Sequence, residues 1–280
     1  MSDRQPADAR QRYDRLAAGY AEWWGPVIAP AALTVLDAVD GLVDGRAPRI
    51  LDLGTGTGTL ALAAARRWPS ARVVGIDPSV GMLGVARAGA DGSAKRRLEF
   101  VQAFADALPF PDGSFDLVVS SFVLQLVPSR FRALREARRV LRPGGAIAFI
   151  TWLSERNDVP FEPDEVFDDV LDAFDLDVPG DDPHPGDVPS ADAAVRQVRR
   201  AGFRDVHASA GLLRHQYEPQ GYLSFLERFD EEDLFASLDD AMRDRVRAEV
   251  LTRLRALRTD ELVLRLPTVL VRGMRGKPTA

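Results

Sequence analysis

The sequence predicts an α/β fold in which a mostly parallel β-sheet is covered by helices. Three observations favour this fold class: short apolar runs alternate with helical patterns, a glycine-rich turn follows the first run, and the second run ends in a carboxylate. Alternating strands and helices run parallel because each helix carries the chain back across the sheet. The expected strands are residues 49–53, 72–77, 98–102, 115–120 and 146–152, then 203–209 and 262–273, with helices near 60–67, 79–88 and 129–141.

The first predicted strand ends in a turn with three glycines at alternate positions, Gly54-Thr-Gly-Thr-Gly58. Glycines let backbone N–H groups approach a ligand because no Cβ stands in the way. The turn departs from the dinucleotide-binding pattern G-x-G-x-x-G, since Thr59 stands at the third glycine position. Asp52 lies beside the turn and the first cation after it is Arg66, so a pyrophosphate would face a carboxylate. A cationic nucleoside without phosphate, such as S-adenosylmethionine, fits this turn better.

The second predicted strand supports the same ligand. It ends at Asp77, about twenty residues after the turn, where such folds place the acid that binds ribose hydroxyls. Pro78 and Ser79 then begin a helix that carries Met82, whose side chain is expected to cover one face of the adenine. Together the two segments predict a nucleoside site at the carboxyl ends of the first two strands.

Four segments resemble the motifs of class I S-adenosylmethionine-dependent methyltransferases of the small-molecule type, the UbiE-like and generic methyltransferase-domain group. In order, they match the glycine motif, the ribose acid, the adenine segment with the start of strand four, and the turn before strand five. The matching segments are 50–58, 76–79, 105–116 and 139–145, within residues 46–152.

The resemblance implies a Rossmann-like, mostly parallel seven-stranded sheet with an antiparallel last strand, together with helical cap or lid elements. It also implies three parts of the chain. These are an N-terminal helical cap (1–45), an S-adenosylmethionine-binding core (46–152), and lid insertions with the last two strands (153–280).

One position departs from the family pattern. Many relatives carry an aspartate that is thought to accept the adenine amine where this chain has Phe104. The phenyl ring either packs on the adenine, with polar contacts from the Ala105 N–H or the Asp106 side chain, or belongs only to the core. The residues expected to bind the cofactor, whose product is S-adenosylhomocysteine, are Tyr13, Tyr20, Asp52, Gly54, Thr55, Gly56, Gly58, Asp77, Pro78, Met82, Phe104, Ala105, Asp106 and Ser120.

Three segments outside the core are expected to build the acceptor chamber: the N-terminal helix, residues 153–195 and residues 218–258. The N-terminal helix has an aromatic face with Tyr13 and Tyr20, whose rings either contact the sulfonium by a cation–π interaction or only pack. Between residues 155 and 187 acidic residues predominate, and apolar residues recur there at helical spacing. This pattern indicates either an amphipathic lid helix with an acidic outer face or an acidic rim that attracts a cationic substrate.

A general base, if the reaction uses one, is expected to be a histidine or a carboxylate, because a free tyrosine has a pKa of about 10. Of the three histidines, His184 lies in a proline-rich loop, and His207 and His215 lie on or just after the sixth strand. His215 is the candidate base and Tyr20 the second candidate catalytic residue, although a surface or hydrogen-bonded role is commoner for such histidines. Gln125 follows the fourth strand, where many relatives place histidine, and could contact the substrate.

Composition excludes several classes of protein. The chain has no cysteine, which rules out disulfides, thiolate catalysis and cysteine-ligated metals, and no metal site is predicted. A net charge of −6 gives no overall attraction to nucleic acid. No apolar run approaches the roughly 20 residues that span a bilayer, and residues 1–8 lack the hydrophobic region of a signal peptide. We expect a cytoplasmic protein with a small-molecule partner and without nucleic-acid or membrane partners.

The predicted function is methyl transfer from S-adenosylmethionine to a small organic acceptor, with oxygen or carbon slightly favoured over nitrogen. Arginine greatly outnumbers lysine, which occurs only at Lys95 and Lys277. This excess of arginine hints at a GC-rich genome and at specialised metabolism. The alternative is a protein that binds the donor without methyl transfer, either an inactive partner subunit or a non-methylating enzyme.

Overall fold

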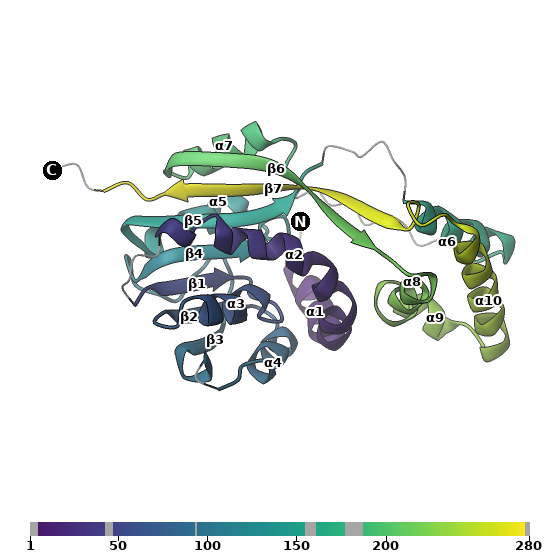
Figure 1. The fold of residues 1–280 in the computed structure, drawn as a ribbon. Helices are drawn as coiled ribbons and strands as arrows, with labels where there is room; N and C mark the ends of the chain where they lie inside the picture. The colour runs from purple at the N-terminus through teal and green to yellow at the C-terminus, as the bar shows by residue number, and fades with distance from the viewer. Residues whose placement is uncertain (1–4, 43–46, 93, 155–160, 177–186, 278–280) are drawn as a thin grey trace. The chain divides into compact units, whose positions relative to one another are not determined.

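The computed structural model describes residues 5–42, 47–92, 94–154, 161–176 and 187–277, with side chains from residue 11 onward. A seven-stranded sheet has the order β3-β2-β1-β4-β5-β7-β6 (Figure 1). The first five strands pair in parallel and β7 is antiparallel to β5, which confirms the predicted fold class. The strands are β1 (Arg49–Leu53), β2 (Arg72–Asp77), β3 (Leu98–Gln102), β4 (Phe115–Ser121), β5 (Leu141–Trp152), β6 (Arg204–Gln216) and β7 (Val263–Met274).

Helices precede β1 and lie between most successive strands. The α-helices are α1 (Gln5–Gly19), α2 (Gly25–Asp37), α3 (Thr59–Arg67), α4 (Val80–Ala88), α5 (Arg130–Val140), α6 (Glu162–Ala173), α7 (Ala191–Arg200), α8 (Pro219–Phe225), α9 (Glu232–Ser237) and α10 (Asp240–Ala256). Two π-helical turns, η1 (Tyr20–Trp24) and η4 (Leu226–Asp230), and two 3₁₀ turns, η2 (Asp40–Leu42) and η3 (Ala94–Arg97), complete the elements.

The chain divides into two compact units. Unit 1 comprises residues 1–155, 184–211 and 267–280, and unit 2 comprises residues 156–183 and 212–266. Strands β6 and β7 each begin in one unit and end in the other. The predicted three-part division into cap, core and lid regions stays a prediction, because compactness does not assign those roles.

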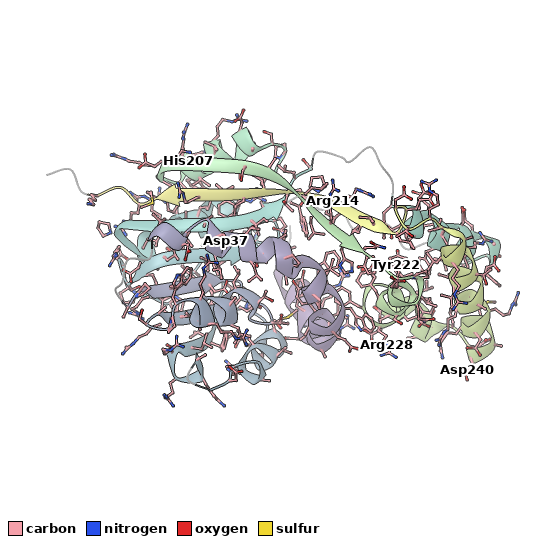
Figure 2. All side chains as sticks on the ribbon, viewed as in Figure 1. Asp37, His207, Arg214, Tyr222, Arg228 and Asp240 are labelled. Atoms are coloured by element: carbon pink, nitrogen blue, oxygen red, sulfur yellow. The ribbon has the colours of Figure 1, made fainter. Side chains whose placement is uncertain are left out.

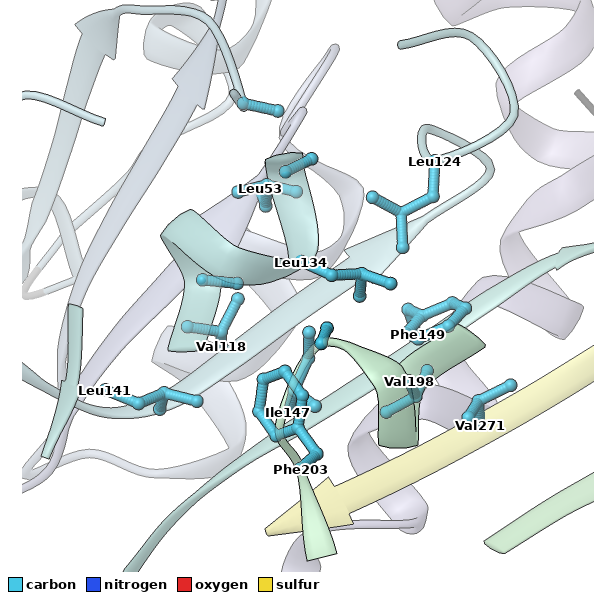
Figure 3. Close-up of a cluster of buried hydrophobic side chains, with 14 of the residues drawn as sticks. Leu53, Val118, Leu124, Leu134, Leu141, Ile147, Phe149, Val198, Phe203 and Val271 are labelled. Carbon is cyan, nitrogen blue, oxygen red and sulfur yellow. The ribbon is translucent and has the colours of Figure 1, made fainter. Parts of the chain in front are cut away.

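A continuous apolar core holds the parallel strands of unit 1 against α5 and α7 (Figure 3). Alternate residues of each strand face this core, because successive side chains of a strand point to opposite faces of the sheet. Ile147 and Phe149 of β5 therefore contact it, whereas Ala148 does not. Residues labelled in Figure 3 include Leu53, Val118, Leu124, Leu134, Leu141, Val198, Phe203 and Val271.

Unit 2 is built on α6, α8 and α10, which pack against one another. The apolar pattern predicted in the acidic stretch forms α6, where Phe167, Val170 and Leu171 are buried and the charged residues face outward. On α10, Val246, Val250 and Leu254 form a buried apolar stripe. The helical content of these segments therefore follows their apolar periodicity, and their role as a lid stays a prediction.

Residues 11–42 form one helical segment that is long and apolar enough to cross a membrane by length and composition, because an 18-residue window within it has a mean hydropathy of 1.3. Residues 11–42 are thus an exception to the expectation that no apolar run approaches the length of a membrane span. A buried helix of a globular protein passes the same test, and α2 packs on α3, β4 and β5 with Val27, Ile28 and Val35 buried. The packing of α2 is that of a core helix of unit 1.

Candidate functional site

The glycine turn joins β1 to α3, and its three glycines all have positive φ angles of 53–90°. Two of them are required by packing within the protein. A Cβ on Gly54 would lie 2.4 Å from both Cγ atoms of Val123, and a Cβ on Gly58 would lie 3.0 Å from the Cβ of Ala86. Gly56 differs, because a Cβ there would meet no protein atom within 4 Å. The middle glycine thus faces open space, where a ligand could approach the backbone.

Packing at Gly54 predicts a stability effect. Gly54→Ala is expected to lower the free energy of unfolding by roughly 1–3 kcal/mol, since it overpacks a tight contact in a φ region that L-residues rarely adopt. Val123→Ala in the same chain removes the clashing methyl groups and is expected to recover part of the loss. Urea unfolding of the single and double variants measures both effects. Equal losses of unfolding free energy in Gly54→Ala and in the double variant Gly54→Ala/Val123→Ala would contradict the steric explanation.

Asp52 lies in β1 directly below the turn and is 1 % exposed. Its Oδ2 accepts hydrogen bonds from the Thr55 hydroxyl at 2.6 Å and from the Ala61 N–H at 3.0 Å. Burial raises the pKa of this carboxyl to about 7, although both hydrogen bonds lower it, and the nearby Asp77 raises it further. Asp52 therefore fixes the turn against the start of α3, and Thr55 is buried with it.

The raised pKa of Asp52 predicts a pH dependence of stability. The folded chain binds this proton more tightly than the unfolded chain, whose carboxyl has a pKa near 3.8. Stability contributed by the protonated form is present at low pH and is lost as the pH rises through about 7. Compared with Asp52→Asn, the native chain is expected to lose about 2 kcal/mol of unfolding free energy between pH 5 and 7. Denaturant unfolding at several pH values measures this, and parallel pH profiles would contradict the assignment.

Asp77 ends β2 beside the glycine turn. Its Oδ2 accepts the Gly56 N–H at 3.0 Å and its Oδ1 accepts the Ser79 N–H at 2.9 Å. Burial raises the pKa of the Asp77 carboxyl, the two backbone hydrogen bonds lower it, and the Asp14 carboxylate raises it. One carboxylate thus connects the open glycine to the start of α4. Its predicted contact with the ribose hydroxyls stays a prediction.

The N-terminal helix brings two tyrosines to the same place. Tyr13 and Tyr20 meet edge to face with ring centroids 6.4 Å apart. Burial raises the pKa of both phenols, and in each case Asp77 raises it further. Tyr20 begins the π-helical turn η1, which ends at Trp24. Both tyrosines are neutral near pH 7, and their contacts with donor or acceptor stay predictions.

The adenine segment follows β3. Phe104 is 46 % exposed, so its ring is not part of the core and is free to contact a ligand. Ala105 is buried, Asp106 is half-buried, and Met82 is buried at the start of α4. The half-buried Pro78 accepts a hydrogen bond at its carbonyl from the Gln102 side chain. Phe104 is therefore not a core residue, and its contact with the adenine stays a prediction.

Polar residues at the ends of β4 and β5 stabilise this edge of the sheet. Ser120 is buried and its hydroxyl donates to the Leu53 carbonyl at 2.7 Å, a structural contact that the sequence did not indicate. The Thr151 hydroxyl donates to the Gln125 side chain at 2.7 Å. The cofactor contact of Ser120 and the substrate contact of Gln125 stay predictions.

The histidines differ in their surroundings. His207 is exposed on β6 in unit 1 (Figure 2), and His184 lies outside the described residues. His215 belongs to unit 2, is half-buried and meets the Tyr217 ring edge-on, with centroids 4.5 Å apart. Burial lowers the pKa of His215, which favours the neutral form that a base requires. The catalytic roles of His215 and Tyr20 stay predictions.

Comparisons with known proteins find similarity in the region that contains this site. The family model described as a methyltransferase domain matches residues 50–145. A demethylmenaquinone methyltransferase from Thermus thermophilus is 44% identical over 115 residues, which cover 41% of this chain and 52% of that protein. The ubiquinone/menaquinone biosynthesis C-methyltransferase UbiE from Methylobacterium nodulans is 36% identical over 171 residues, which cover 59% of this chain and 63% of that protein. The chain thus spans about half the length of the curated relatives it matches.

Among solved structures, the [4+2]-cyclase SpnF aligns with a TM-score of 0.52 at 23% identity, covering 88% of this chain and 82% of that chain. This likeness shows a shared fold. The family match begins within β1, includes the glycine turn and Asp77, and ends in β5. Residues 50–145 are thus similar to a methyltransferase domain.

Proposed function

We propose that this chain transfers the methyl group of S-adenosylmethionine to a small organic acceptor. The observation that carries the proposal is the open side of Gly56, whose N–H is held by the Asp77 carboxylate. The charge of Asp14 raises the pKa of the Asp77 carboxyl, and the charge of Asp77 raises the pKa of the Asp52 carboxyl. The Asp14 and Asp77 carboxylates favour a cationic ligand over an anionic one, because opposite charge stabilises ionised carboxylates. These residues suit a sulfonium nucleoside and disfavour a pyrophosphate.

The residues present suit the tasks that methyl transfer requires. The sulfonium supplies an activated methyl group, so the protein must mainly position donor and acceptor and keep water away. Orientation of this kind can lower the activation barrier of a bimolecular reaction by roughly 7–11 kcal/mol. We assign the glycine turn and Asp77 to the ribose and amino acid part, and Phe104 with Met82 to the adenine. Tyr13 and Tyr20 shield the site beside Asp77.

The chemical class of the acceptor is proposed from the names of the relatives and from the charge of α6. Two relatives that match the core are named for demethylmenaquinone and for ubiquinone or menaquinone biosynthesis, and the second is named a C-methyltransferase, which supports carbon as the methylated atom. The acidic outer face of α6 keeps a nitrogen acceptor in consideration. We propose a small acceptor of specialised metabolism and a cytoplasmic location, without nucleic-acid or membrane partners.

Turnover with methyl-labelled S-adenosylmethionine tests the proposal. The full chain is incubated with separate panels of quinols and phenols, carboxylic acids, and amines. We expect label in one panel, with release of one S-adenosylhomocysteine for each methyl group transferred. Donor binding without release across all panels would contradict methyl transfer.

The alternative function is donor binding without methyl transfer. It gains support from the fold that this chain shares with a protein named as a [4+2]-cyclase, since one fold can host several reactions. Under this alternative, S-adenosylhomocysteine binds as tightly as under the first proposal, but no acceptor receives label. The turnover experiment therefore separates the two functions.

A further inference from the structure

Asp14 of α1 caps a helix that lies far from it in the sequence. Its Oδ1 accepts the Ser79 hydroxyl at 2.6 Å and the Gly81 N–H at 2.9 Å. These bonds satisfy donors at the start of α4, where a carboxylate also interacts favourably with the helix dipole. Ser79 is the N-cap residue of α4 and also accepts the Met82 N–H at 3.1 Å. The first turn of α4 is thus held by its own cap and by a residue of α1.

The two helices approach closely at this point. A Cβ on Gly81 would lie 2.6 Å from the Asp14 backbone oxygen, a distance that real Cβ atoms do not show. Only glycine at position 81 permits this approach. The contact is therefore specific to the place where Asp14 reaches the start of α4.

A continuous series of hydrogen bonds leads from Asp14 to the glycine turn. Ser79 donates its hydroxyl to Asp14 and its backbone N–H to Asp77, and Asp77 accepts the Gly56 N–H on its other oxygen. Tyr13 lies next to Asp14 on α1, and Asp77 affects the ionisation of its phenol. The series joins α1, the start of α4 and the turn proposed to bind the donor.

We propose that Asp14 is a positioning residue that fastens α1 to the donor site and keeps Tyr13 and Tyr20 beside Asp77. This inference rests on the proposed function, because it concerns affinity for the same donor. When α1 is undocked, the donor loses the surface that the two tyrosines provide. The observed affinity falls in proportion to the fraction of molecules in which α1 is docked. Asp14 acts through Ser79 and α1, and no direct contact with the donor is needed.

The test compares Asp14→Ala with Asp239→Ala. Asp239 caps α10 in unit 2 by accepting the Met242 N–H at 2.7 Å, so its loss removes a similar helix cap in the unit that does not contain the glycine turn. Calorimetry with S-adenosylhomocysteine measures affinity, and amide hydrogen exchange measures opening of residues 11–24 and 80–88. We expect Asp14→Ala to weaken binding at least tenfold and to speed exchange in residues 11–24. Asp239→Ala should bind like the native chain.

The outcomes separate this inference from the proposed function. Affinity of Asp14→Ala within twofold of the native chain, or faster exchange confined to residues 80–88, would overturn the positioning role. If Asp14→Ala does not fold, Asp14→Asn replaces it in the comparison, because the asparagine oxygen is a weaker hydrogen-bond acceptor. Native affinity of Asp14→Asn would also overturn the positioning role. Failure of the native chain to bind S-adenosylhomocysteine would instead refute the proposed function.

Discussion

Replacing Asp77 with alanine is expected to weaken S-adenosylhomocysteine binding by more than tenfold. A carboxylate that accepts ribose hydroxyls makes charge-assisted hydrogen bonds, and each contributes roughly 1.5–3 kcal/mol. The substitution also frees the Gly56 N–H, which Asp77 holds at 3.0 Å, so the turn becomes less well ordered. Isothermal titration calorimetry of the two proteins measures the change in affinity.

Asp116 provides a matched control for Asp77. It lies near the start of β4, accepts the Arg49 N–H at 2.6 Å and forms an ion pair with Arg142. Asp116→Ala therefore removes another sheet carboxylate with a backbone partner, but at the opposite ends of the parallel strands. We expect unchanged affinity in this variant. Equal affinity of Asp77→Ala and the native chain would refute the ribose role of Asp77.

Gly56→Val is expected to abolish donor binding while the fold persists. No protein atom lies within 4 Å of the position of its Cβ, so the side chain would occupy space left for the ligand. The φ angle of +53° adds a conformational cost of on the order of 1 kcal/mol to the fold. Circular dichroism and thermal unfolding measure the fold, and calorimetry measures binding.

Gly92→Val separates the conformational cost from the loss of binding. Gly92 has a φ angle of +47° and equally open surroundings, but it follows α4 and lies outside the donor site. We expect both valine variants to lose similar stability and only Gly56→Val to lose binding. Retained binding in Gly56→Val would show that the turn does not hold the donor.

The strands of the core could be predicted from the sequence because each is a short apolar run bounded by turn residues. The residues of β1, β2 and β3 agree with the predicted ranges. β5 begins earlier than predicted, since Leu141 pairs with Phe115 and an irregular stretch with Gly144 at φ +81° follows before the regular pairing resumes. β6 continues to Gln216 rather than ending at residue 209, because its pairing with β7 is a tertiary contact without a local sequence signal.

The sequence gives a local signal for some residues of the candidate site and none for residues whose role depends on distant contacts. Asp77 and the glycine turn stand at recognisable positions after two strands. Asp14 gave no such signal, since its partners lie more than sixty residues away, at 79 and 81. Gly81, a glycine within the first turn of a helix, is a sign of close backbone approach that could have pointed to it.

The most direct test of the account is calorimetric titration of the purified full chain with S-adenosylhomocysteine and, separately, with NAD. We predict saturable binding of one S-adenosylhomocysteine per chain and no heat from NAD, because the carboxylates around the glycine turn exclude a pyrophosphate. Saturable binding of NAD without binding of S-adenosylhomocysteine would contradict the account.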